Sequence, residues 1–360
     1  MPSPPSLLVT VDTEGDDEWS FRRNPASENI GWLRDFEEAL ARVGCKSTYL
    51  VTYTVAQDDR AAEILRGYRD TRGSEIGAHC HAWNTPPEAE PEGAQLFLNE
   101  LSESVQREKL GNLTHVIEER LGVRPVSFRG GRFGANAATM KCLTELGYQV
   151  DSSVTPGVSW RRTPGLPGGE GGPDYRRAPV HSYWQDTSDP CSPGDGPLLE
   201  VPVTVVRSRR LPAAAENALA AYGPASFASA VAGKLGLGRM MWFYPAFQEA
   251  DEMVQAAEIA AGREGGDVLT MMLHSSEVMP GGSPYLKTKG DVAAFLDRME
   301  KALEAVQKTT GAVPRTLGEV AQEKGIARTV RKKAARMVRE ASDAEIPRGG
   351  RSATEGDAAC

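Results

Sequence analysis

The chain has 360 residues, with 41 Lys plus Arg against 49 Asp plus Glu, and its formal net charge is −8. Hydrophobic residues make up 40 % and charged residues 25 % of the sequence, as in ordinary soluble globular proteins. The acidic balance argues against a nucleic-acid-binding protein, because such proteins carry a basic excess or a basic face. No run of 18 apolar residues occurs, which excludes a transmembrane helix.

The N-terminus and the cysteines indicate a cytoplasmic protein. The first residues, MPSPPS, lack the basic and apolar regions of a signal peptide. The five cysteines are odd in number and irregularly spaced, so they predict neither a disulfide framework nor a Cys-x-x-Cys metal site. The sequence leaves the oligomeric state open.

Short apolar, β-branched runs alternate with stretches of helical period along most of the chain. The predicted strands are residues 7–11, 47–52, 75–78, 125–129, 149–152, 198–205 and 268–273. Apolar stripes of helical spacing run through residues 30–43, 101–121 and 292–306. This alternation predicts an α/β fold with a parallel sheet, either open or closed into a barrel.

Two segments break this alternation. Residues 156–197 contain eight Pro and eight Gly, and we expect them to form a lid insertion or a poorly ordered one. Residues 324–339 contain seven basic side chains and no acidic one, which is typical of a solvated amphipathic helix. We therefore expect a catalytic domain over residues 1–320, followed at 321–360 by a basic helix and a disordered tail.

Polar residues follow four of the predicted strands at the points where the strands end. They are Asp12 and Glu14 after the first strand, His79 and His81 after the third, Arg129 after the fourth and His274 after the last. Active sites of parallel α/β proteins form at these carboxyl ends.

The spacing of these residues indicates a metal site. Side chains two positions apart on an extended strand share a face, so His79 and His81 point the same way, as do Asp12 and Glu14. Two imidazoles and one carboxylate make a three-ligand site for a divalent metal with an open position for water. The alternatives are a solvated acidic loop over residues 12–18 and structural histidines. The occurrence of these carboxylates and histidines together at neighbouring strand ends favours the metal site over both alternatives. Cys80 is a weaker ligand candidate, because its side chain faces away from those of His79 and His81.

The remaining polar residues fit hydrolysis. A carboxylate beside a metal ligand can accept a proton from water, and His274 could protonate a leaving group. Arg129 could orient a carboxylate or bind substrate, and a structural ion pair accounts for it about equally well.

The ordered set of motifs resembles the polysaccharide deacetylases of carbohydrate esterase family 4, which share the NodB-homology domain. The segments that carry this resemblance are VTVDTE (9–14), EIGAHCH (75–81), RPVSFRGGRFG (124–134), DSSV (151–154) and LH (273–274). The segments HCHAWNTPP (79–87) and HSSEVMPGGSPY (274–285) look closest to the WalW-like branch. The resemblance spans roughly residues 6–320, and its specificity lies in the order of the motifs.

The resemblance implies a distorted or incomplete (β/α) barrel of about seven parallel strands. It also implies metal-dependent removal of an N- or O-acetyl group from a sugar, with one divalent metal, for which we expect Zn²⁺. In the family's pattern Asp12 would be the general base, Glu14 the metal carboxylate, His79 the first metal histidine, Arg129 the tether of Asp12 and His274 the general acid.

The chain departs from the family's pattern at the second metal histidine, which normally lies four residues after the first. Trp83 occupies that position here, so His81 would have to take the role. The candidate substrate-binding residues are Trp83, Arg132, Trp160 and Trp184.

We therefore predict a metal-dependent deacetylase that acts on an acetylated sugar or glycan precursor. A C–N hydrolase of the same fold that acts on a non-sugar amide or ureide is the first alternative. A catalytically impaired glycan-binding protein is the second, because of the departure at Trp83.

Overall fold

The computed structural model describes residues 3–88, 93–209 and 238–344, with no side-chain description for 331–344. The chain divides into two compact units, residues 1–320 and 321–360. All the site residues predicted from the sequence lie in the first unit, within the described ranges.

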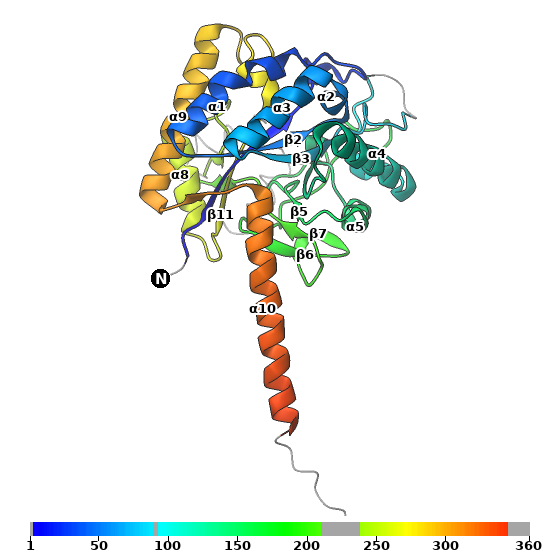
Figure 1. The fold of residues 1–360 in the computed structure, drawn as a ribbon, viewed down its shortest axis with the longest axis vertical. Coiled ribbons are helices and arrows are strands. Elements are labelled where there is room, and N and C mark those ends of the chain that lie inside the picture. Colours follow the sequence, from blue (N-terminus) through cyan, green and yellow to red (C-terminus); the bar gives the residue numbers. More distant parts are fainter. Residues whose placement is uncertain (1–2, 89–92, 210–237, 345–360) are drawn as a thin grey trace, which may run out of the picture. The chain divides into compact units, whose positions relative to one another are not determined.

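One mostly parallel sheet forms the centre of the first unit (Figure 1). Its strands run in the order β11 (Val268–His274), β1 (Ser6–Thr13), β2 (Ser47–Val51), β3 (Glu75–Cys80), β4 (Ser127–Gly130), β5 (Val150–Asp151) and β8 (Leu199–Glu200). Each is parallel to its neighbours. Beyond β8 the antiparallel strands β6 (Tyr183–Asp186) and β7 (Asp189–Pro193) extend the sheet, and β12 (Val313–Pro314) pairs with β1.

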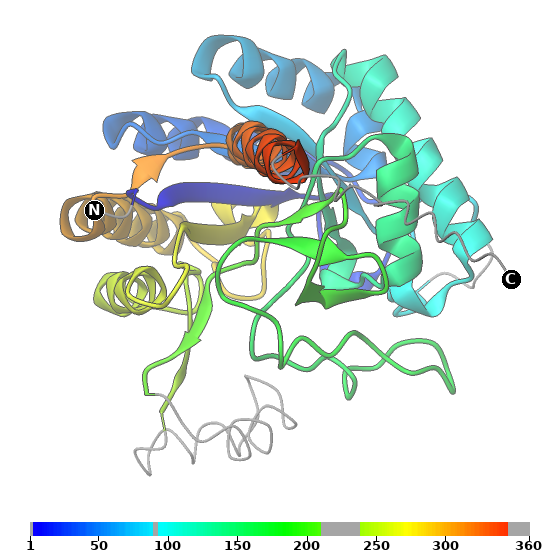
Figure 2. The same ribbon diagram turned by 90° about the horizontal axis from the view of Figure 1, so that it is seen from below.

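Helices cover the outer face of this sheet (Figures 1 and 2). They are α1 (Leu33–Arg42), α3 (Asp59–Arg72), α4 (Glu103–Leu121), α5 (Ala137–Leu146), α8 (Ala250–Ala261) and α9 (Lys289–Thr310), with the short α2 (Tyr53–Gln57) beside α4. The expected start and stop signals are present on α4: the Ser102 side chain caps its N-terminus, and Gly122, with φ of 67°, ends it in the left-handed conformation.

Alternation along β1 separates the core from the site. Leu7, Val9 and Val11 belong to the large apolar cluster that the helices complete. Thr10, on the opposite face, contacts Arg129 inside the curled sheet. Every residue of the strand after Ser6 is buried, so β1 lies at the middle of the unit, with Thr10 and Asp12 on its inner face.

The sheet curls into an incomplete barrel, as the sequence predicts. The gap between β8 and β11 is crossed by an irregular segment whose backbone continues the hydrogen bonding. The amide of Val201 donates to Asp151 O, that of Val203 to Val154 O, and that of Thr204 to Thr270 O of β11. The predicted strand 198–205 is therefore wrong as one element. It consists of β8, this crossing, and the start of β9 (Val205–Arg207), which pairs with β10 (Met240–Trp242).

The Pro/Gly-rich segment contains more regular structure than its composition predicts. Residues 183–193 form the β6–β7 hairpin and join the sheet, so the expectation of an irregular insertion is wrong for this part. Residues 156–182 lack long elements, and their role as a lid stays a prediction. The basic segment 324–339 lies in α10 (Leu317–Ala344), and the predicted disordered tail falls at 345–360, outside the described residues. Among the described residues no helix has both the length and the apolar character needed to cross a membrane.

Candidate metal and catalytic site

The predicted site residues converge at the carboxyl ends of the parallel strands. In the register of the sheet Asp12 of β1 lies opposite His274 of β11, and His79 of β3 lies opposite Arg129 of β4. Glu14 follows β1 and His81 follows β3. The four strand ends therefore face one another, as the parallel topology requires.

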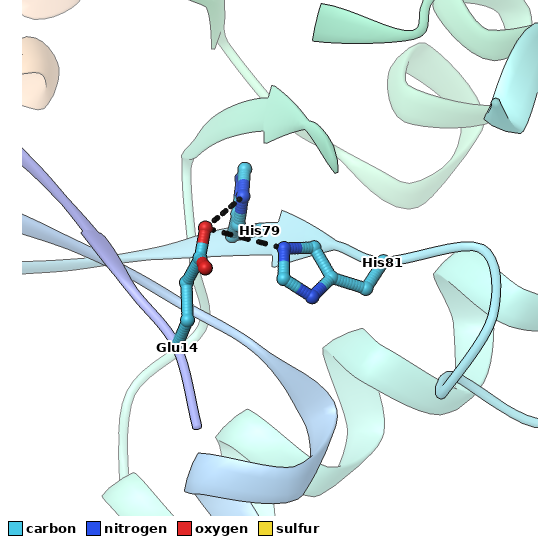
Figure 3. Close-up of side chains that lie close together, drawn as sticks. All are labelled: Glu14, His79 and His81. Carbon is cyan, nitrogen blue, oxygen red and sulfur yellow. Dashed lines mark ion pairs between the residues drawn. The ribbon is translucent and has the colours of Figure 1, made fainter. Parts of the chain in front are cut away.

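Glu14, His79 and His81 form a compact buried group (Figure 3). Glu14 Oε1 lies 3.4 Å from His79 Nε2 and 3.3 Å from His81 Nε2. One ligand atom from each residue lies within 4.8 Å of the others, and Asp12, Glu14 and His274 satisfy the same criterion. A carboxylate with two imidazole nitrogens is the donor set of many zinc and iron sites.

The outer nitrogen of each imidazole faces an acceptor, which directs Nε2 toward Glu14. His79 Nδ1 lies 3.0 Å from the Arg129 carbonyl oxygen, and His81 Nδ1 lies 3.3 Å from Glu18 Oε2. Because both partners are acceptors, each ring keeps a proton on Nδ1 and directs Nε2 at the centre, where a bound cation would take the place of an Nε2 proton. Metal-binding histidines in proteins are commonly oriented by such partners.

The electrostatics of the group also favour a bound cation. Burial acts to lower the pKa of His81, but Glu18 and Glu14 outweigh it and raise that pKa to about 10. Burial acts to raise the pKa of Glu14, and the neighbouring histidines outweigh it and lower that pKa. The centre therefore attracts positive charge, which a divalent cation on these three residues would supply.

Glu18 is a site residue that sequence reasoning missed, because it stands among several acidic residues after the first strand and its spacing does not single it out. It is 5 % exposed and accepts hydrogen bonds from Trp83 Nε1 (3.1 Å) and Asn84 Nδ2 (3.0 Å). Trp83 is 7 % exposed and stacks on His81, with ring centroids 4.1 Å apart. Trp83 therefore helps to position the His81 ring. The role of Trp83 in substrate binding stays a prediction.

Asp12 is held by a fully buried arginine. Arg129 Nη1 donates to Asp12 Oδ1 at 2.6 Å, while Nε donates to the Ser152 carbonyl and Nη2 to the Thr10 and Ser152 hydroxyls. The guanidinium thus neutralises the carboxylate charge and fixes one of its oxygens. The other oxygen, Oδ2, lies 3.8 Å from His79 Nε2 and faces the metal group.

His274 faces the same group from β11. Its Nε2 lies 3.8 Å from Glu14 Oε1, and its Nδ1 lies 3.0 Å from the Tyr244 hydroxyl. Tyr244 donates its proton to Glu277, so it accepts the Nδ1 proton of His274. Burial acts to lower the pKa of His274, but Glu14 and Glu277 outweigh it and raise that pKa to about 9. Tyr244 and Glu277 were not predicted, although Glu277 stands only three residues after His274.

A second buried carboxylate pair lies at the ends of β5 and β8. Asp151 and Glu200 are both fully buried, and the Gln185 amide donates to both at 3.3 and 2.9 Å. Burial raises the pKa of Asp151 and that of Glu200, and the nearby Asp151 charge raises the latter further. Burial and the closeness of the two carboxyl groups therefore favour the protonated form of the pair, which lies beside the segment whose Ser152 holds Arg129.

The other predicted substrate residues lie in loops and at the edge of the sheet. The Arg132 guanidinium lies 3.9 Å from the centroid of the Phe97 ring and donates to the carbonyls of Gln95 and Pro164. Trp160 stacks on Phe133 at 5.4 Å and donates to Thr155. Trp184 lies on β6, opposite Leu199 of β8.

Comparison with known proteins supports the fold through solved structures. No family model matches the chain, and no curated protein matches its sequence. A protein from Parabacteroides distasonis described as a glycoside hydrolase/deacetylase matches with a TM-score of 0.57 and 12 % identity, over 89 % of this chain and 71 % of that one. The chain has the fold of the polysaccharide deacetylases.

Two further deacetylase structures match at lower TM-scores. A polysaccharide deacetylase from Pseudomonas aeruginosa PAO1 gives 0.49 with 16 % identity, over 88 % of this chain and 89 % of that one. One from Mycobacterium smegmatis gives 0.44 with 18 % identity, over 88 % and 95 %. The WalW-like branch stays a prediction.

Proposed function

We propose that this protein is a metal-dependent deacetylase that hydrolyses an N- or O-acetyl group on a sugar or glycan precursor. The observation that carries this proposal is the convergence of the Glu14–His79–His81 group with the Arg129-bound Asp12 and with His274. These residues together offer a cation site, a proton acceptor and a proton donor within one buried cluster. The deacetylase fold supports the same reaction class.

Glu14, His79 and His81 would hold one divalent cation, for which the nitrogen-rich donor set favours Zn²⁺. Bound there, the cation would act as a Lewis acid toward the acyl oxygen and the attacking water. The remaining steps belong to residues of the chain itself.

Asp12 would accept the proton of the attacking water through Oδ2. Arg129 occupies Oδ1 and keeps the carboxylate oriented, so the free oxygen faces the cluster. His274 would donate the Nε2 proton to the departing nitrogen or oxygen while Tyr244 accepts from Nδ1. The water oxygen forms the new bond to the acyl carbon, the old C–N or C–O bond breaks, and the leaving atom takes the proton.

Acetate release from acetylated sugar oligomers tests the proposal. Purified protein loaded with Zn²⁺ should release acetate from an N-acetylglucosamine oligomer or an O-acetylated xylan oligomer, and removal of the metal should abolish that release. Ammonia release from a ureide instead of acetate would favour the C–N hydrolase. Protein that takes up no stoichiometric divalent metal and turns over no substrate, but still binds the oligomers, would favour a glycan-binding protein; stoichiometric metal that is lost in Glu14→Ala would exclude it.

The compartment is part of the proposal. The four cysteines in the described part of the chain, Cys45, Cys80, Cys142 and Cys191, are free thiols. Free thiols are typical of a reducing compartment, and we infer a cytoplasmic enzyme that acts on a glycan precursor.

A further inference from the structure

Three exposed aromatic side chains gather beside His274. Trp19, Phe247 and Tyr285 are 38 %, 50 % and 44 % exposed, and we call them the aromatic patch. Trp19 lies edge-on to His274 with ring centroids 5.1 Å apart, and Tyr285 lies 5.8 Å from Trp19. Phe247 completes the patch 5.1 Å from Tyr285. A continuous set of rings thus leads from the candidate proton donor to the surface.

The patch is built from three loops at the same edge of the sheet as the site. Trp19 belongs to the 3-10 turn Glu18–Ser20 that follows β1, and its neighbour Glu18 is fixed by His81, Trp83 and Asn84. Phe247 lies between β10 and α8, and packs on the buried Tyr244 with ring centroids 4.5 Å apart. Tyr285 lies between β11 and α9. Buried residues therefore anchor the patch on two sides.

Aromatic side chains that lie together and exposed on a protein surface are informative. Exposed large apolar side chains scattered singly are ordinary, whereas a contiguous group commonly marks a binding surface. Of the six large hydrophobic side chains exposed in the described part of the chain, three belong to this patch. Their near-perpendicular packing, at interplanar angles of 85° and 84° for the two pairs within the patch, exposes ring faces in different directions.

We propose that the aromatic patch binds the pyranose ring of the group that leaves when the acyl bond breaks. This inference rests on the proposed function, in which His274 protonates the leaving atom. The group that carries this atom must then lie on the His274 side of the cluster, which is where the patch lies. Pyranose rings present a face of C–H groups that packs on aromatic side chains, so the patch selects a sugar over an acyclic leaving group.

Binding of deacetylated oligomers tests the subsite without turnover. The metal-loaded protein is titrated with glucosamine tetramer and with xylotetraose, which carry no acetyl group. We expect at least one to bind, with its Kd raised about three- to tenfold in Tyr285→Ala and in Phe247→Ala. Trp32→Ala is the control, because Trp32 is 42 % exposed and lies outside the patch. Its Kd should match that of the unsubstituted protein.

Kinetics separate sugar binding from an effect on His274. With an acetylated oligomer, the patch variants should raise KM by the same factor and leave kcat nearly unchanged. With ethyl acetate, which offers the acetyl group without a ring, they should behave like the unsubstituted protein. An equal loss of activity on both substrates would overturn the inference, as would failure of both tetramers to bind. If no acetylated sugar is hydrolysed but the patch variants still weaken tetramer binding, the proposed reaction fails and the sugar subsite stands.

Discussion

Substitution of Glu18 by Gln should weaken metal binding although Glu18 is not itself a proposed ligand. Its carboxylate faces His81 Nδ1 at 3.3 Å and also accepts from Trp83 and Asn84. All these partners are donors, and they converge on two oxygens. The amide of Gln offers one oxygen and one NH₂ group, so at least one donor would meet another donor.

The size of the effect follows from these contacts. Loss of the negative charge and of one hydrogen bond leaves His81 less basic and less firmly oriented. Loss of such an orienting partner typically lowers metal affinity about 10- to 100-fold, or about 1.4–2.8 kcal/mol. The buried unsatisfied donor should also lower the free energy of unfolding by about 1–3 kcal/mol.

Calorimetric titration of metal-free protein with Zn²⁺ measures the change, with chemical denaturation as the stability assay. Asp17→Asn is the matched control, since Asp17 is the adjacent acid and its side chain is 52 % exposed. The control should bind Zn²⁺ like the unsubstituted protein. An unchanged Kd for Glu18→Gln would refute the reasoning that Glu18 orients His81. If Zn²⁺ binding weakened equally in Glu18→Gln and Asp17→Asn, the change in net charge would explain the effect.

Two further predictions concern the proposed roles and the second carboxylate pair. His274→Ala should lower turnover about 10²- to 10⁴-fold with little loss of bound metal, whereas His79→Ala should lose both; equal metal loss, measured by elemental analysis, would contradict these roles. The raised pKa values of Asp151 and Glu200 mean that the folded state keeps a proton that the unfolded chain releases, so the pair's contribution to stability is lost as the pH rises through the folded-state pKa values. As the pH rises above the ordinary carboxyl pKa, Glu200→Gln should therefore lose less free energy of unfolding than the unsubstituted protein, and parallel pH profiles in urea denaturation would contradict this.

Much of the fold could be predicted because the parallel strands are short, β-branched and bounded by polar residues. β1 is the clearest case: it was predicted at 7–11 and observed at Ser6–Thr13. The hairpin at 183–193 could not be predicted, because Pro190, Pro193 and Gly194 lie in or next to it and its strands pair at the edge of the sheet, where composition constrains them least. The split of 198–205 likewise depends on the position of β11, a contact distant in sequence.

The convergence of the candidate site was predictable to the extent that it depends on strand ends. Asp12, Glu14, His79 and His274 each end a strand or stand within two residues of its end, so the parallel topology alone brings them together. Glu18 and Glu277 lie in short 3-10 turns and Tyr244 in a loop, and only the folded chain shows that they contact His81 and His274. The aromatic patch was missed for the same reason, because its three residues come from segments as far apart as positions 19 and 285.

The proposed second metal histidine, His81, stands at a different position from the one that the deacetylase resemblance implies. His81 stands two residues after His79 instead of four. Trp83, which stands at the usual position, stacks behind the His81 ring, while Glu18 faces its outer nitrogen. These contacts hold Nε2 of His81 3.3 Å from Glu14, nearly the distance at which His79 stands. We therefore expect Trp83 and Glu18 together to orient His81 for metal binding, so that Trp83→His, which restores the spacing of the family pattern, should weaken the contact that holds the His81 ring.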